Sequence, residues 1–470
     1  MKKIAILLLF VVSLIGCSKE SIDPIAKAPQ EKELIREIAL LVGNAMTDPN
    51  VKNEVLGAMA EVDEFNELVS ISYMMGSTRN LRENEVDFLA EPNKMKQTRT
   101  MFFKQAVSEE FNANKHNYPS LKRELENRVS ESAKLKSFNA ADPDLFAQVL
   151  EGTGFQIYFP YSHIMDHSIP LQTFYVSYDP MTGATTNDAL LFETGRDGFT
   201  VINEINNDFT FENPVFGVIP IDPCDIPGQP CDFTYLTGYT AEEMAKIIST
   251  PPVFPNVPRL ITHNFHHAQM TDDRDLITTR IPWIRVNNTK WMGFLASHQK
   301  LTFWRAGGKG TVVIAPNGQL TAPGFDHTVG AVRMRQINIK ELRWFAMDGD
   351  FDAEWKMFEN RHSLIVFSNH DISTSASVTA GFKVGLKRDT AGNWVPNVNA
   401  TLSGTINIKE GRSRFRAISN LERRQVFLTN VGAEPTGEYK LINGVPFNVK
   451  SIGIVSYIFQ HWHTSLVTTN

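Results

Sequence analysis

Acidic side chains gather in one short run in the last third of the chain. Asp348, Asp350, Asp352 and Glu354 stand at alternate positions, and Glu359 follows five residues later. Carboxylate oxygens are hard ligands, and several of them placed close together suit Ca²⁺. The spacing therefore makes calcium the cofactor that this run would take.

The same spacing resembles the calcium loop of an EF-hand, with acids at relative positions 1, 3, 5 and 12. The run departs from that pattern at position 6, where Ala353 replaces the glycine, and its flanks have the pattern of strands. We expect a loop between two strands. It either holds calcium through Asp348, Asp350 and Asp352 or is a solvated acidic turn.

Histidines form a second group of potential ligands. His461 and His463 lie on the last predicted strand, where residues i and i+2 share a face about 7 Å apart and can chelate a transition metal such as zinc. A place in the core or on the surface is the alternative. His263, His266 and His267 also lie close in sequence, but on a strand the outer two would be about 13 Å apart, too far for one ion.

Residues 1–17 contain the segments of an export signal in their usual order. Lys2 and Lys3 precede an apolar run too short to span a bilayer, and Leu14-Ile-Gly-Cys17 follows. This segment resembles a bacterial lipoprotein signal peptide with its lipobox. The resemblance implies removal of residues 1–16, diacylglycerol on the Cys17 sulfur and acylation of the new amine. An ordinary secretory signal or a membrane anchor is the alternative.

The lipid anchor implies a bacterial cell-envelope location, which we expect to be the outer membrane, with 17–30 as a tether. Lys19-Glu20 resembles the short charged signals that direct some Bacteroidetes lipoproteins to the cell surface. Asp389-Thr390-Ala391 resembles the O-glycosylation motif of exported Bacteroidetes proteins.

Lipidation of Cys17 would leave Cys224 and Cys231 as a pair. In an exported chain we expect a disulfide, which stabilises an eight-residue loop by about 2.5 kcal/mol in the chain-entropy model. The alternative is a metal site in which the two thiolates join Asp222 or Asp225, although the spacing is not that of a zinc site.

The overall charge is mildly acidic. The formal charge is −6 over 470 residues, and loss of Lys2 and Lys3 would move it to −8. There is no run rich in lysine or arginine, so we expect no nucleic-acid partner.

The apolar pattern changes its period along the chain. Residues 31–150 have helical spacing, whereas 151–258 and 259–470 mainly alternate with period two between turn signals. We expect an α+β protein with a helical domain over 31–150, a β-rich domain with one short helix over 151–258, and a β-sandwich-like domain over 259–470.

Intact nucleophile elbows, H-E-x-x-H pairs, P-loops and G-x-G-x-x-G turns do not occur in this sequence. We therefore favour a lipid-anchored envelope protein that binds a partner protein or a glycan over an enzyme. Trp283, Trp291 and Trp304 would stack on sugars if one face exposed them, and would otherwise belong to the core. A metal-dependent hydrolase that uses the histidine clusters and a structural assembly subunit are the alternatives.

Overall fold

The structure is a computed structural model. It describes residues 24–466 except 64–66, 77–101, 135–142, 166–169, 181–183, 227–228, 230, 248–250, 254–255, 262–269, 309–312, 315–319, 356–360, 370–376, 384–385, 389–393, 397–402, 410–412, 424–425, 427–438 and 443–444. Cys17, Thr390 and the histidines at 263, 266 and 267 therefore lie outside the described residues.

The first helix begins at Pro24, earlier than the helical spacing over 31–150 predicts, so residues 24–30 of the expected tether are helical. Helix α2 spans Pro24–Ala45 and α3 spans Pro49–Val62, with the Asp48 side chain accepting the Asn50 N–H at 2.8 Å as the N-cap of α3. The other helices of this part are α4 (Ile71–Met74), α6 (Phe102–Ala113), α7 (Pro119–Lys134), α8 (Pro143–Glu151) and α9 (Phe209–Glu212).

These helices pack on a sheet whose strands follow the order β1-β2-β6-β3-β4-β5. Strands β3 and β6 are parallel, and the other neighbours are antiparallel. The strands are β1 (Leu68–Ser70), β2 (Phe155–Tyr158), β3 (Thr173–Tyr178), β4 (Thr186–Glu193), β5 (Phe199–Asn206) and β6 (Val215–Pro220). Strand β1 lies inside the stretch expected to be helical, and the sequence pattern did not indicate β4.

Helices and sheet share one hydrophobic core. Ile38 of α2, Phe111 of α6, Phe174 of β3 and Val218 of β6 belong to the same cluster of buried side chains. Residues 24–221 therefore form one N-terminal lobe. The expected boundary at residue 150 falls inside this lobe, because the apolar faces of the helices are buried by the strands that follow them.

The remaining strands form two sheets. One has the order β21-β22-β23-β10-β14-β8 with β9 beside β23, and the other has the order β19-β16-β13-β11-β15-β20 with β7 and β12 beside β13. Their bounds are β7 (Thr234–Tyr235), β8 (Gly238–Tyr239), β9 (Arg259–Leu260), β10 (Asp275–Val286), β11 (His298–Gly308), β12 (Val313–Ile314), β13 (Leu320–Arg335), β14 (Trp344–Asp352), β15 (Arg361–Asn369), β16 (Ser377–Lys383), β19 (Ser403–Lys409), β20 (Ser413–Glu422), β21 (Tyr439–Ile442), β22 (Val445–Ile452) and β23 (Val455–Ser465). Strands β17 (Leu386–Arg388) and β18 (Trp394–Pro396) pair with each other.

The two sheets face each other across a common core. Ile281 of β10 and Phe459 of β23 belong to the same buried cluster as Phe303 of β11 and Val366 of β15. Helix α10 (Ala241–Lys246) is the short helix expected in 151–258 and begins with a capping box of Thr240 and Glu243, and α11 (Gln336–Lys340) follows β13. We call residues 222–466 the C-terminal lobe. The expected boundary at residue 258 falls inside it, because β7 and β8 join its sheets.

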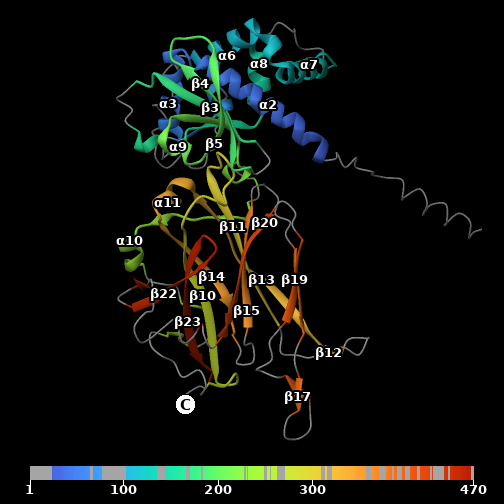
Figure 1. Ribbon diagram of the computed structural model, residues 1–470, viewed down its shortest axis with the longest axis vertical. Helices are drawn as coiled ribbons and strands as arrows, with labels where there is room; N and C mark the ends of the chain where they lie inside the picture. Colours follow the sequence, from blue (N-terminus) through green and yellow to red (C-terminus); the bar gives the residue numbers. More distant parts are fainter. Residues whose placement is uncertain are drawn as a thin grey trace, which may run out of the picture.

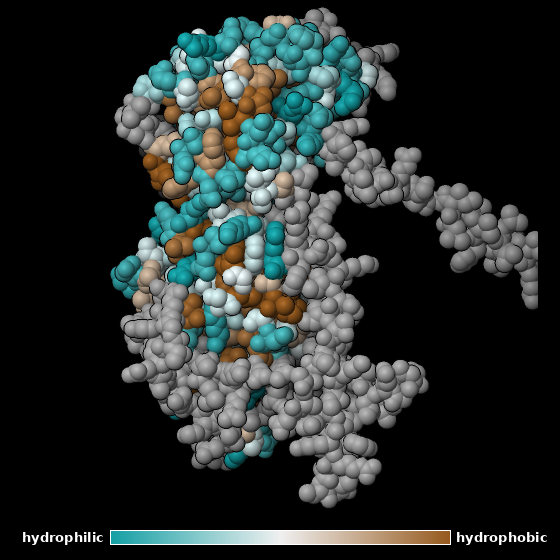
Figure 2. All heavy atoms as spheres, viewed as in Figure 1, coloured by the Kyte–Doolittle hydropathy of each residue, from teal (hydrophilic) through white to brown (hydrophobic). Residues whose placement is uncertain are grey.

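The α+β fold class is confirmed, with the helices mostly in the first lobe and a sheet-rich second lobe (Figure 1). The two lobes follow each other along the longest axis. Apolar side chains reach the visible surface of both lobes in patches (Figure 2). No helix in the described part of the chain has the length and apolarity needed to cross a membrane.

Candidate functional site

The three aspartates of the acidic run lie on strand β14, which ends at Asp352, so the expectation that they lie in a loop between strands is wrong. Asp348 and Asp350 are ion-paired with Arg280 of the neighbouring β10, at 3.1 Å and 2.6 Å. Burial raises the pKa of Asp348, and the Arg280 charge opposes that shift. The sequence pattern did not reveal this partner because Arg280 is 68 residues away.

A bulge separates the third carboxylate from the other two. Thr279 faces Asp352 across the strands while the next residue, Arg280, faces Asp350, so β14 holds one extra residue at this point. Asp352 consequently turns inward and is 3% exposed. The structure does not bring the three aspartates around one ion, and calcium binding by Asp348 and Asp350 stays a prediction.

Asp352 belongs to a cluster of charges inside the sandwich. It is ion-paired with Arg305 of β11, and its Oδ2 lies 3.5 Å from Nε2 of His362 on β15. Arg423 is buried nearby and donates to the Trp355 carbonyl at 3.4 Å. Burial raises the pKa of Asp352 to about 6 although Arg305 lowers it, and burial also holds the pKa of His362 well below its usual range.

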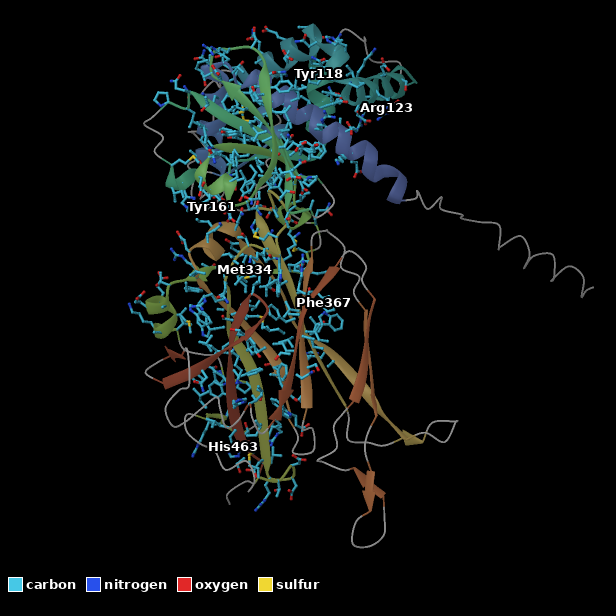
Figure 3. The ribbon with its side chains drawn as sticks, in the orientation of Figure 1. Tyr118, Arg123, Tyr161, Met334, Phe367 and His463 are labelled. Carbon is cyan, nitrogen blue, oxygen red and sulfur yellow. A yellow bond between two sulfur atoms is a disulfide. The ribbon has the colours of Figure 1, made fainter. Side chains whose placement is uncertain are left out.

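The two histidines of the last strand have protein partners of different kinds. His461 is fully buried, and its Nδ1 lies 2.9 Å from the Thr279 hydroxyl. Burial, with the Lys450 and Arg423 charges, lowers the pKa of His461 to about 3. His463 is partly exposed and lies 2.8 Å from Asp275, at the far end of the sandwich from the other lobe (Figure 3). Metal binding by the pair stays a prediction.

A different set of possible ligands meets beside the disulfide. Within the described ranges, Asp222, Asp225 and His298 are the three side chains whose ligand atoms all lie within 4.8 Å of one another. Asp225 ends the short 3₁₀ turn Pro223–Asp225, and Cys224 is bonded to Cys231 as predicted. His298 begins β11. The sequence suggested Asp222 and Asp225 only as partners of the cysteines, and no pattern pointed to His298.

Two cations already neutralise this set. Lys300 lies 2.8 Å from Asp222, and Arg333 of β13 lies 2.6 Å from Asp225. Burial, together with the Arg333 and Arg335 charges, lowers the pKa of His298 to about 3, so its imidazole is neutral at pH 7. A divalent ion would have to compete with both cations for the carboxylates, whereas the pairs as they stand hold the disulfide loop on the sheet.

Aromatic rings complete the surroundings of the two cations. Lys300 lies over Phe233 at 5.6 Å from the ring centroid, and Arg333 lies over Tyr235 at 5.5 Å. Tyr235 is 38% exposed, so an aromatic residue next to a neutralised charge cluster reaches the surface here. The same face of β13 continues to Arg335 two residues later.

Arg335 connects the lobes. Its Nη2 donates to Asp63 Oδ1 at 2.6 Å, its Nη1 donates to Asp63 Oδ2 at 3.3 Å, and Glu67 Oε2 lies 3.6 Å away. All three side chains are buried. Glu67 also accepts the backbone N–H of Tyr161 at 2.8 Å. Figure 3 shows Tyr161 at the border of the first lobe and Met334, next to Arg335, at the facing end of the sandwich.

Apolar contacts and amide pairs extend this junction. Leu295 packs so closely on β6 that a methyl group at Gly217 would lie 2.7 Å from its Cδ1. Asn207 donates to the Gly293 carbonyl and accepts the Leu295 N–H, both at 3.2 Å. The junction therefore combines a buried ion pair with close apolar packing. It fixes how the two lobes are joined.

The tryptophans do not form the exposed platform that sugar stacking would need. Trp283 is 2% exposed and belongs to the core, while Trp291 and Trp304 are half-buried. The burial of Trp283 supports its interpretation as a core residue.

Comparisons with protein families, with curated proteins and with solved structures find no match for this chain.

Proposed function

We propose that the protein is a lipid-anchored protein of the bacterial cell envelope that holds a two-lobed body at the membrane and binds a partner there. The lipobox-like segment ending at Cys17 supports the anchor, and residues 17–30, the last seven of which begin helix α2, would separate the body from the bilayer. The outer membrane is the proposed location.

The observation that carries a binding role is the buried junction at Arg335. Desolvating one arginine and two carboxylates is costly, and such groups are tolerated inside a protein when their geometry pairs them. Here the bidentate pair with Asp63 supplies that geometry. A binding protein whose two lobes present one surface needs a fixed junction, and this contact supports that requirement.

The anchor is tested with Cys17→Ala in the native host. We expect the variant to keep its signal peptide and to lose its fatty-acid label, while Cys231→Ala, which also removes one thiol, is cleaved and labelled as the wild type is. Metabolic labelling with an alkyne-tagged fatty acid should therefore mark the wild type and Cys231→Ala only. Equal labelling and equal cleavage of Cys17→Ala and the wild type would exclude lipidation at this residue.

A metal-dependent hydrolase is a second candidate, favoured by the meeting of Asp222, Asp225 and His298. A neutral imidazole and two carboxylates are a ligand set that zinc accepts. Metal analysis of the purified chain decides it: stoichiometric zinc that disappears in His298→Ala but persists in His463→Ala supports the hydrolase. Zinc that His298→Ala does not change argues against a site here.

A further inference from the structure

Among the residues that the structure describes, strand β5 forms an edge of the N-terminal sheet. It is the last strand in the sheet order and pairs with β4 alone among the described residues (Figure 1). An edge strand carries a row of backbone N–H and C=O groups directed away from its neighbour, and these groups can pair with another extended chain. At eight residues, β5 is longer than β1, the three-residue strand at the opposite edge.

Apolar side chains stand on this edge. Phe199 is 46% exposed and Val201 is 50% exposed, and the two share one face because they are two residues apart. Helix α2 packs on the same face of the sheet over the strands next to β5. The ring of Phe199 lies 5.7 Å from Phe192 of β4, and a methyl group at Gly43 of α2 would lie 2.4 Å from Phe192. Helix α2 packs on β3, β6 and β4, and the apolar surface continues from β4 onto β5, where Phe199 and Val201 are exposed.

The first half of β5 lacks the devices that usually protect an edge. The strand contains no proline and no lysine. Its bulge lies between Ile202 and Ile205, where Glu204 has a φ of 56°. Because the bulge comes late, the register with β4 is regular from Phe199 to Ile202. These residues offer a straight segment for pairing.

The surroundings of the edge are acidic. Residues 186–212 contain six acids and one arginine. Arg196 pairs with Glu193, and Lys340 pairs with Asp208. The other four acids form no ion pair with the described part of the chain, and they are Asp188, Asp197, Glu204 and Glu212. A strand bound along β5 would therefore lie in a negative potential, which favours a basic occupant and disfavours a second copy of the same acidic edge.

We propose that residues 199–202 bind an extended strand of a partner protein, with apolar side chains at alternate positions and lysine or arginine between them. The backbone pairs would supply affinity, Phe199 and Val201 would contact the apolar positions, and the acids would select the basic ones. This inference rests on the proposed partner-binding function and names the class of partner.

The test uses the full chain, purified in detergent, and a short fluorescent peptide that alternates lysine and valine. Matched peptides replace every lysine by glutamate or the central valine by proline. We expect the lysine peptide to bind at least tenfold more tightly than either control, and to slow hydrogen exchange of residues 199–202. Binding should weaken with salt, as pairing of opposite charges requires.

Two substitutions place the site. Phe199→Lys and Val201→Lys should each weaken binding at least tenfold, because a lysine on the edge repels the basic strand. Val253→Lys is the matched control, since Val253 is 98% exposed and lies elsewhere. It should leave binding unchanged.

Equal affinity for the lysine and glutamate peptides, or an equal loss in Val253→Lys, would overturn the proposal. A dimer that Val201→Lys dissociates would also overturn it, because a second copy would then occupy the edge. These outcomes would not contradict the proposed lipid anchor, since Val201→Lys should still enter the membrane fraction. Failure of the anchor would instead appear as fatty-acid labelling that does not depend on Cys17.

Discussion

The two lobes bury charge in different ways. In the N-terminal lobe, buried Glu37 accepts the backbone N–H groups of Ser120 and Leu121, at 2.9 Å and 2.8 Å, and so satisfies the start of helix α7. In the sandwich, Asp352 meets Arg305 and His362 within the interior. Glu37 is therefore paired with fixed backbone dipoles, whereas Asp352 is paired with titratable side chains.

This difference teaches where the molecule is sensitive. A backbone N–H does not titrate, so the pairing of Glu37 depends on helix α7 staying folded. The interior of the sandwich depends on the protonation and presence of each partner. Substitutions and pH changes should therefore lower the stability of the sandwich more than that of the first lobe. The junction at Arg335 should determine whether a loss of stability in one lobe also destabilises the other.

The largest effect is expected at the junction. Arg335→Met leaves Asp63 and Glu67 buried without their cation, so the free energy of unfolding should fall by about 3–5 kcal/mol. All seven tryptophans lie in the C-terminal lobe, at positions from 283 to 462. Tryptophan fluorescence therefore follows the sandwich, and far-ultraviolet circular dichroism follows mainly the helices of the first lobe.

In the wild type we expect the two probes to report one denaturant transition, and in Arg335→Met two. Arg343→Met is the control, because Arg343 is 31% exposed and its pair with Glu341 is a surface contact. It should change stability by less than about 1 kcal/mol. Coincident transitions in Arg335→Met would show that apolar packing alone couples the lobes.

The next effect concerns the interior of the sandwich. Asp352→Asn removes the carboxylate from Arg305 and should lower the free energy of unfolding by about 3 kcal/mol. The double variant Arg305→Met, Asp352→Leu removes both charges and should lose less than Asp352→Asn alone. Urea titrations followed by fluorescence measure both.

Asp350→Asn supplies the matched control for that comparison. The same substitution two residues away affects a carboxylate that is 52% exposed, so it should lower stability by less than about 1 kcal/mol. If Asp350→Asn and Asp352→Asn lower the free energy of unfolding equally, burial of Asp352 beyond the β14 bulge does not make its ion pair more important for stability.

The smallest effect is a pH dependence. The pKa of His461 is lowered to about 3, so the unfolded chain binds the proton first, and stability present above pH 6.5 is lost as the pH falls toward 3. Between pH 7 and pH 5 the loss is about 2 kcal/mol for one such histidine. Asp352, with its pKa raised to about 6, acts in the opposite direction, since its burial favours the protonated form.

His461→Gln should therefore flatten the dependence of the unfolding free energy on pH by about 2 kcal/mol over this range. His327→Gln, at an exposed position, is the control and should leave the slope unchanged. A slope that His461→Gln does not alter would mean that this histidine binds its proton at the same pH in the folded and the unfolded chain.

Local pattern determined much of the fold. The cap at Asp48, the capping box of Thr240 and Glu243 and the strands at Phe155 and Phe199 follow from neighbouring residues, because helix caps and period-two alternation are set within a few positions. The disulfide of Cys224 and Cys231 also follows from residues close in sequence.

Long-range pairing decided the rest. The spacing of the acids on β14 resembles that of a calcium loop. Their partner Arg280 and the bulge that turns Asp352 inward come from pairing with β10, a strand far away in sequence, so the spacing could not reveal them. His298 lies near Asp222 and Asp225 because β11 packs against the disulfide loop. Arg335 pairs with Asp63, which is 272 residues away in sequence. The sequence alone determined which residues can carry charge or bind a metal, and tertiary structure decided which of them meet, because the strand pairs and lobe contacts that bring them together join distant parts of the chain.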